Sequence, residues 1–210
     1  MVIRVVLLDA GGILFSNVTE ESDFLVELAE RHGADLDRLA ARLDARDGEY
    51  EVDRRHVHDV LIDCIAEAGG SRERWDADWV DARYRANVRA HPVAFAALGR
   101  FRDRHPGVLL ALANNEAAHW DRLKDRDHHH LDRFDVIGSS WALAAVKPGE
   151  DYFDRLLAAC GRKAEEALFI DDNADNVTAA TRYGIHSVLA TDPEIAAGAL
   201  SGLGSGWGGA

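Results

Sequence analysis

The residues with the clearest chemical potential are three aspartates that follow apolar runs. Asp9 ends the run MVIRVVLLD, and Asp171 and Asp172 end the run ALFIDD. If these runs are neighbouring strands, their ends bring the carboxylates together, and like charges at short range are unfavourable without a cation. Because the available ligands are oxygens, with no His or Cys nearby in the chain, the pattern predicts a Mg²⁺ site.

Lys147 is the natural partner of these carboxylates. It is one of only three lysines among the 24 basic residues, and it precedes Pro148 at an expected helix start. A fixed ammonium beside carboxylates and a hard cation would form a binding site for a phosphoryl group. Asn114 and Asn115, which follow the run VLLALA, add polar side chains at another expected strand end.

A parallel sheet is the arrangement that brings these residues together. Strand-like runs are expected at 1–9, 108–113, 134–140, 167–172 and 185–190, with helical patterns between the later ones. Strands that alternate with helices of about 10–15 residues indicate βαβ units and a parallel sheet. Ligands of such sheets bind beyond the carboxyl ends of the strands. We therefore expect an α/β fold with its site at that edge.

The first expected strand is separated from the others by a long helical segment. From Asn17 to about Ala90 the apolar residues recur at helical spacing, and no strand-like run appears. This pattern predicts an α/β core formed by 1–16 and 91–200, with an all-helical insertion at 17–90. Residues 201–210 are expected to be a Gly-rich tail; the Gly-rich composition begins at Gly198, from where we expect the chain to be loosely held, although Trp207 could dock.

Composition limits the classes of function. The 210 residues suit one sizeable domain or a core with an insertion, and the net charge of −13 argues against nucleic acid or an anionic membrane as partner. No apolar run approaches the roughly 20 residues that cross a bilayer, and no secretion signal is evident. Cys64 and Cys160 indicate neither a disulfide framework nor a thiolate metal site. We expect a cytoplasmic protein, monomeric or homodimeric.

Four segments carry a family resemblance. LLDAGGILF, LLALANN, VKPGEDYF and FIDDNADNVTAATRYGI resemble, in order, the four motifs of the haloacid dehalogenase-like (HAD) superfamily. The resemblance spans nearly all of the chain and implies a Rossmann-like HAD core, with a parallel sheet flanked by helices and 17–90 as an inserted helical cap. The likeness is closest to the branch of sugar-1-phosphate phosphatases and soluble epoxide hydrolase phosphatase domains, which Asn114 and His119 also suit.

The resemblance implies a Mg²⁺-dependent phosphatase of a small phosphorylated metabolite, such as a sugar phosphate. Asp9 would be the nucleophile that forms an aspartyl-phosphate intermediate. Lys147 would orient Asp9 and neutralise phosphate charge, while Asn114 and Asn115 would contact the phosphate or its surroundings.

The implied metal ligands come from the first and fourth motifs. Asp9 and the backbone carbonyl of Gly11 would be ligands from the first motif. Asp172 would bind the metal directly, and Asp171 would bind it directly or through water.

Two positions depart from the family pattern. Gly11 stands where most family phosphatases keep an aspartate that acts as general acid, and losing such help costs about 10²–10⁴-fold in rate. Ala113 stands where a Ser or Thr usually hydrogen-bonds the phosphate, at a cost of roughly 1–3 kcal/mol. Glu116 and His119 are candidates for a substitute water activator. These departures predict a preference for substrates with good leaving groups.

Two other functions remain open from the sequence. A dehalogenase would use Asp9 as a nucleophile on carbon without a metal, which Asp171 and Asp172 disfavour. A catalytically impaired scaffold that binds a metabolite or a partner is favoured by Gly11 and Ala113. Taken residue by residue, Asp171, Asp172 or Asn173 could also simply cap the following helix.

Several other polar residues favour structural interpretations. The run from His128 to His130, in DRDHHHLDRF, is expected in a solvated loop or helix end rather than at a metal. Ser139 and Ser140 are expected in a turn or cap. In the insertion, each of a set of basic residues is expected on an exposed helical face, with substrate contact as the alternative: Arg54, Arg55, His56 and His58.

Overall fold

A computed structural model describes residues 2–203, so Trp207 lies outside the described residues. Within them, five parallel strands form one sheet in the order β3-β2-β1-β4-β5. The strands are β1 (Val5–Leu8), β2 (Leu109–Leu112), β3 (Val136–Ile137), β4 (Ala167–Asp171) and β5 (His186–Leu189). The predicted α/β fold with a parallel sheet is therefore confirmed.

The register of the sheet fixes which strand ends meet. Leu8 of β1 lies opposite Leu112 of β2 and Ile170 of β4. Asp9 and Asp171 thus leave the sheet side by side at its carboxyl edge.

Alternating residues of the strands serve two separate cores. Val6 and Leu8 pack in the cluster on one face, whereas Val5 and Leu7 pack in the cluster on the other. All four residues of β1 are buried because helices cover both faces, which is why the strand reads as a continuous apolar run.

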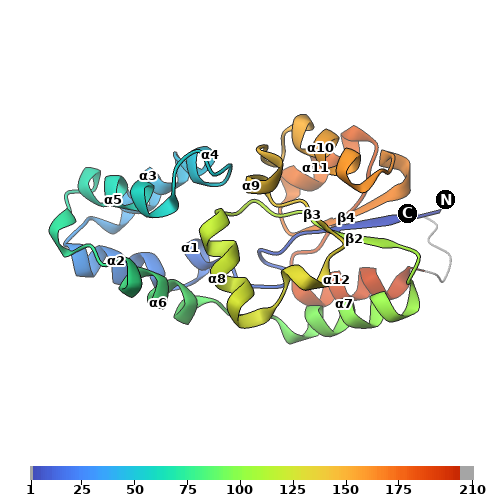
Figure 1. Ribbon diagram of the computed structural model, residues 1–210, viewed down its shortest axis with the longest axis horizontal. Coiled ribbons are helices and arrows are strands. Elements are labelled where there is room, and N and C mark those ends of the chain that lie inside the picture. The colour runs from blue at the N-terminus through green and yellow to red at the C-terminus, as the bar shows by residue number, and fades with distance from the viewer. Residues whose placement is uncertain (1, 204–210) are drawn as a thin grey trace.

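Two pairs of helices cover the sheet (Figure 1). On one face lie α7 (Pro92–Arg104) and α12 (Pro193–Gly202), and on the other lie α10 (Glu150–Cys160) and α11 (Ala174–Tyr183). The shorter elements of this part are α9 (Ser140–Leu143), η2 (Leu131–Arg133) and η3 (Ala164–Glu166).

Helix α12 corrects the expectation of a loosely held tail from Gly198. The helix continues to Gly202, its N-cap Asp192 accepts a 2.8 Å hydrogen bond from the backbone N–H of Ile195, and Pro193 occupies its first turn. Ala196, Ala197 and Leu200 are buried against α7. The many glycines suggested a tail by composition, yet the spacing of the apolar residues puts them on one face of the helix, and this face packs on the core.

The segment after β1 folds into helices that lie to one side of the sheet (Figure 1). Its elements are α1 (Val18–Glu21), α2 (Phe24–His32), α3 (Leu36–Asp44), α4 (Asp47–Tyr50), α5 (Val57–Glu67), η1 (Arg72–Arg74) and α6 (Ala77–Asn87). Its apolar core is not confined to this segment, because Ala117, Trp120 and Leu123 at α8 (Ala118–His128) belong to the same cluster. Helix α8 therefore joins the insertion to the sheet-containing part.

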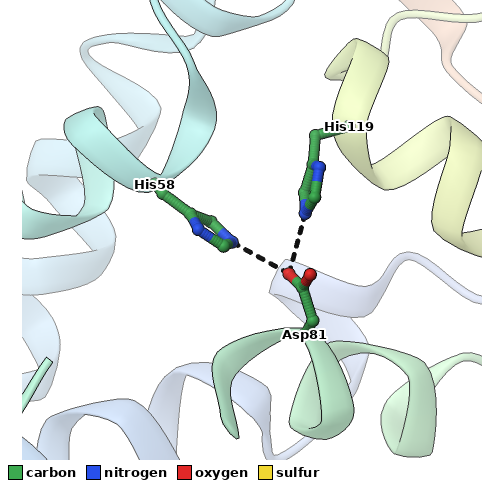
Figure 2. A group of neighbouring side chains, drawn as sticks. All are labelled: His58, Asp81 and His119. Atoms are coloured by element: carbon green, nitrogen blue, oxygen red, sulfur yellow. Dashed lines mark hydrogen bonds and ion pairs between the residues drawn. The ribbon is translucent and has the colours of Figure 1, made fainter. Parts of the chain in front are cut away.

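Polar contacts reinforce this junction. Arg85 of α6 binds Asp127 of α8 through two hydrogen bonds of 2.8 and 2.6 Å. His58 of α5 and His119 of α8 both contact Asp81 of α6, at 2.9 and 2.8 Å (Figure 2).

The histidine run 128–130 differs in part from the expected solvated segment. His128 ends α8, and His129 is its C-cap with a φ of 48°. His130, by contrast, is fully buried, and its Nε2 lies 2.9 Å from Asp121 Oδ1. Asp121 also accepts hydrogen bonds from Ser139 Oγ and Trp141 Nε1, so this histidine belongs to a buried polar network.

Across residues 2–203 no helix is long and apolar enough to cross a membrane.

Replacement of Trp120 tests the junction. Its ring is 2% exposed and stacks on Tyr84 of α6 at 4.7 Å between centroids. We expect Trp120→Ala to lower the free energy of unfolding by about 3–5 kcal/mol, because it leaves a large cavity. Trp79→Ala, at a partly exposed ring, should cost about 1 kcal/mol. Urea unfolding followed by circular dichroism measures both, and equal losses would contradict the assignment of α8 to the shared core.

Candidate active site

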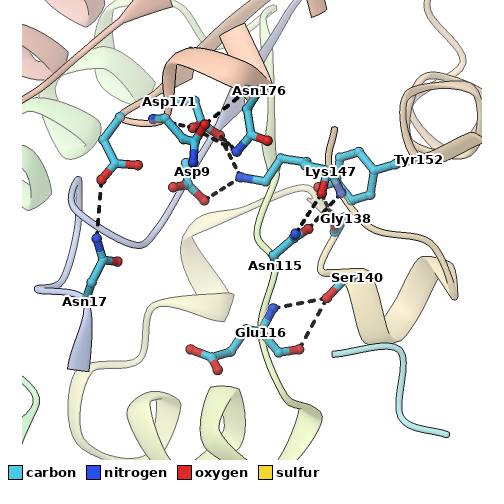
Figure 3. Close-up of polar contacts among 12 residues, drawn as sticks. Asp9, Asn17, Asn115, Glu116, Gly138, Ser140, Lys147, Tyr152, Asp171 and Asn176 are labelled. Atoms are coloured by element: carbon cyan, nitrogen blue, oxygen red, sulfur yellow. Dashed lines mark hydrogen bonds and ion pairs between the residues drawn. The ribbon is translucent and has the colours of Figure 1, made fainter. Parts of the chain in front are cut away.

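A buried lysine connects the ends of β1 and β4 (Figure 3). Lys147 Nζ donates hydrogen bonds to Asp9 Oδ1 at 2.9 Å and to Asp171 Oδ2 at 2.6 Å. The three side chains are 2%, 7% and 0% exposed, respectively. The adjacency of β1 and β4 brings the two carboxylates together, and the chain before α10 supplies the ammonium between them.

Asn115 holds the backbone of Lys147 in place. Its side-chain Oδ1 accepts a 2.9 Å hydrogen bond from the Lys147 N–H, and its Nδ2 donates a 3.1 Å bond to the Lys147 carbonyl (Figure 3). Both ends of the amide are thus engaged by one residue. The sequence suggested phosphate contact for Asn115, whereas the structure gives it the task of positioning the lysine.

Burial and charge set the protonation of this group. Burial alone would lower the pKa of Lys147, but the carboxylates of Asp9 and Asp171 raise it above its usual value, so the lysine stays charged. Burial raises the pKa of Asp9 to about 7; Lys147 opposes this rise, and Asp171 and Asp172 add to it. Burial, and then Asp171, also raise the pKa of Asp172.

The N-terminus of α11 fixes Asp171. Asn173 caps the helix, because its Oδ1 accepts hydrogen bonds from the N–H groups of Asp175 and Asn176. Asp171 Oδ1 in turn accepts from the Asn173 N–H at 2.8 Å and from Asn176 Nδ2 at 3.1 Å. The capping role that the sequence left open thus falls to Asn173.

The three aspartates fit a hard divalent cation. One oxygen from each of Asp9, Asp171 and Asp172 lies within 4.8 Å of the others. When all three carboxylates are ionised, the single ammonium of Lys147 leaves an excess of two negative charges, which one divalent cation balances. Asp172 is partly exposed and lines the pocket together with Asp9, whereas Asp171 is fully enclosed by its partners.

The small residues after Asp9 make room for this arrangement. Gly12 has a φ of 60°, and a Cβ there would lie 1.9 Å from Asp172 Oδ2, so only glycine allows the approach. The Gly11 carbonyl accepts a 2.6 Å hydrogen bond from the Ile13 N–H. A carbonyl oxygen has a second lone pair, so this bond does not prevent it from acting as a metal ligand.

Asn17 fills the space beside Gly11. A Cβ on Gly11 would lie only 2.4 Å from Asn17 Oδ1, and Asn17 Nδ2 donates a 3.3 Å hydrogen bond to Asp172 Oδ2 (Figure 3). An amide from the start of the insertion therefore stands where a side chain at position 11 would project. Sequence analysis did not indicate this residue, because nothing in the local pattern places Asn17 beside Asp172.

Asn114 presents an unpaired donor to the pocket. The side chain is 2% exposed, lines the pocket beside Asp9 and Gly11, and its Nδ2 has no hydrogen-bond partner within the described residues. Such a buried donor is costly unless a ligand or water accepts from it. Ala113 packs instead with Tyr152 and Phe153 in the apolar core.

The two proposed auxiliary residues have separate environments. Glu116 lines an adjoining part of the pocket, where it is paired with the buried ammonium of Lys124 and accepts a 3.4 Å hydrogen bond from the Tyr84 hydroxyl. His119 is directed to Asp81 in the insertion, with its Nε2 2.8 Å from Asp81 Oδ1 (Figure 2). Two of the three lysines of the chain, Lys124 and Lys147, therefore line the pocket.

Glu51 is a pocket residue that the sequence did not indicate. It follows α4 and lines the pocket with Asp9, and its backbone carbonyl accepts a 2.7 Å hydrogen bond from Ser140 Oγ. Burial raises the pKa of its carboxyl to about 8, and Asp47 and Glu116 add to the rise. Burial thus favours the neutral form of this carboxyl.

The basic residues of the insertion lie elsewhere. Arg55 binds Glu49 and Asp63 at 3.0 and 2.9 Å on the surface. His58 faces Asp81, and His56 accepts a 3.2 Å hydrogen bond from the His58 N–H at the start of α5. The exposed-face interpretation thus describes Arg54 and His56, whereas Arg55 is only partly exposed and His58 is buried.

Comparison with known proteins agrees with this architecture. The chain matches the family model described as haloacid dehalogenase-like hydrolase over residues 3–184. A HAD family enzyme from Bacteroides thetaiotaomicron has a TM-score of 0.70 and 17% identity, covering 90% of this chain and 93% of that chain. It has also been solved in complex with magnesium and inorganic phosphate.

Two further solved structures share the fold. A HAD-like family hydrolase from Porphyromonas gingivalis has a TM-score of 0.68 and 21% identity, covering 90% of this chain and 91% of that chain. The L-2-haloacid dehalogenase from Xanthobacter autotrophicus has a TM-score of 0.61 and 19% identity, covering 88% and 76%, respectively. With the family model matched over most of its length, the chain belongs to the haloacid dehalogenase-like hydrolases.

Proposed function

We propose that this hydrolase is a Mg²⁺-dependent phosphatase of a small phosphorylated metabolite. The observation that supports this most is the Lys147 ammonium, which bridges Asp9 and Asp171. Asp172 lies close enough to these two carboxylates to share one bound Mg²⁺ with them. This arrangement combines a buried carboxylate nucleophile with fixed positive charge for a phosphoryl group.

In this proposal the two oxygens of Asp9 have separate tasks. Oδ1 accepts the hydrogen bond from Lys147, while Oδ2 lies on the side of Gly11 and the pocket. In the proposed reaction Oδ2 attacks phosphorus, the bond from phosphorus to the leaving oxygen breaks with its electron pair going to that oxygen, which takes a proton from water, and an aspartyl-phosphate forms. Water then attacks this intermediate, which releases phosphate and restores the Asp9 carboxylate. Lys147 and the free donor of Asn114 neutralise or bind phosphate oxygens.

Asp9, Asp172 and the Gly11 carbonyl would hold Mg²⁺, and Asp171 would bind it directly or through water. When bound, the cation supplies electrostatic stabilisation of the phosphoryl oxygens. The magnesium and phosphate complex of the Bacteroides enzyme supports this choice of cofactor and ligand. The similarity to a haloacid dehalogenase keeps carbon–halogen cleavage as the rival activity, and three clustered carboxylates weigh against it.

Replacement of the nucleophile tests the proposal directly. A screen of phosphorylated metabolites with Mg²⁺ should reveal release of inorganic phosphate by the native protein. Asp9→Asn should abolish it, by more than about 10⁴-fold, because the variant cannot form the covalent intermediate. Phosphate release and the mass of a trapped intermediate are the measurements.

The same screen separates the rivals. Turnover of 2-haloacids that withstands EDTA would establish a dehalogenase. Thermal stabilisation by a metabolite, with no turnover and no effect of Asp9→Asn, would establish a catalytically impaired binding protein. Glu27→Gln, in the insertion and away from the pocket, is a matched control for loss of one carboxylate.

The absence of a side chain at Gly11 predicts a dependence on the leaving group. Sugar 1-phosphates and acyl phosphates release a more stable leaving group than simple alkyl phosphates, so they suffer less from the missing general acid. We expect kcat/KM to favour them over glycerol phosphate by on the order of 10²-fold. A panel in which glycerol phosphate exceeds every sugar 1-phosphate would overturn this expectation.

Asn17 limits how well a general acid can be restored at position 11. Gly11→Asp alone should gain little, because its Cβ would lie 2.4 Å from Asn17 Oδ1, so the Asn17 side chain must turn away and lose its hydrogen bond to Asp172. Gly11→Asp combined with Asn17→Gly should raise turnover of alkyl phosphates by about 10-fold or more, a part of the usual 10²–10⁴-fold contribution. Steady-state kinetics of both single variants and the double variant measures this, and equal activity of Gly11→Asp and the double variant would contradict the steric role of Asn17.

A further inference from the structure

Three side chains outside the pocket converge between the insertion and α8. His58 comes from α5, Asp81 from α6 and His119 from α8, and their polar ends point toward one another (Figure 2). His58 Nε2 lies 2.9 Å and His119 Nε2 lies 2.8 Å from the same oxygen, Asp81 Oδ1. One ligand atom from each residue lies within 4.8 Å of the others.

The chemistry of this cluster differs from that of the aspartate site. Two imidazoles and a carboxylate are ligands that Zn²⁺ and related transition metals bind, whereas Mg²⁺ prefers oxygen alone. Three protein ligands also leave room for water or another ligand in a tetrahedral site.

The surroundings favour an ordered but reachable site. His58 is buried, while Asp81 and His119 remain 23% and 24% exposed, which leaves a path for an ion. Their three helices are held by the apolar core that the insertion shares with α8. His56 packs beside the cluster, with ring centroids 5.0 Å from His58 and 4.8 Å from His119, and it is exposed.

We propose that His58, Asp81 and His119 form a second metal site, which binds a transition metal such as Zn²⁺ separately from the Asp9 site. In the ion-free protein, both rings direct Nε2 at one carboxylate oxygen. On binding, the two nitrogens and the carboxylate turn their lone pairs to the ion, and the protons on those nitrogens are released or move to Nδ1. The ion would then link α5, α6 and α8.

The test uses the full chain with excess Mg²⁺, which keeps the aspartate site occupied. Zn²⁺ is titrated by calorimetry, and Co²⁺ is added as a spectroscopic probe of nitrogen coordination. We expect one Zn²⁺ per chain and a higher Tm with Zn²⁺. The double variant His58→Ala/His119→Ala should weaken binding by more than about 100-fold, since even residues behind metal ligands contribute about 10–100-fold.

Matched variants keep the result interpretable. His105→Ala/His186→Ala also removes two histidines, but from outside the cluster, and should bind Zn²⁺ as the native chain does. Asp81→Asn preserves the size of the side chain and an acceptor oxygen, so it tests the carboxylate even if the double variant fails to fold. It should lose the Tm increase caused by Zn²⁺ and most of the affinity.

Three outcomes would overturn the proposal. The first is no Zn²⁺ binding by the native chain at micromolar concentrations, which would leave the cluster as a hydrogen-bonded junction. The second is equal binding by native protein and Asp81→Asn. The third is binding that survives His58→Ala/His119→Ala but disappears with Asp9→Asn/Asp172→Asn, which would assign the ion to the aspartate site. None of these outcomes depends on phosphatase activity.

Discussion

The buried ammonium of Lys147 is the interaction on which the rest of the site depends. Burying an ion costs several kcal/mol unless partners of opposite charge surround it. Asp9 and Asp171 supply those partners, and they do so only because β1 and β4 are adjacent and in register. Asn115, which follows β2, fixes the backbone of Lys147. Residues at the ends of three strands and just before α10 thus together hold this one charged side chain in place.

The order of elements and this charge cluster could be predicted from sequence because both depend on local signals. Buried parallel strands read as continuous apolar runs, and polar residues directly after them must lie at the carboxyl edge. Asp9, Asp171 and Asp172 satisfied that rule, and the scarcity of lysine drew attention to Lys147. The strand run 167–172 and the observed β4 differ by a single residue.

Other features depend on contacts between distant segments and had no local signal. Asn17 reaches Asp172 across 155 positions of sequence, and Glu51 enters the pocket only because the insertion folds back over it. In α12, composition misled: the glycines of 198–202 suggested a tail, while burial of Leu200 against the sheet-covering helix α7 decided the structure. Tertiary packing overrides weak local propensity in such cases.

The shared core of α8 and the insertion connects the lining of the pocket to the residues around Lys147. Helix α8 begins three residues after Asn115, the residue that holds Lys147, and its Trp120 is buried among rings of the insertion. Ser140 makes a second link, because its Oγ contacts both the Glu51 carbonyl and the Glu116 N–H. The insertion therefore cannot move away as a free lid without disturbing packed side chains. Even α4 is tied to α8, because Tyr50 packs against Trp120 with ring centroids 5.7 Å apart. Any opening of the pocket must therefore carry α8 along or break these contacts.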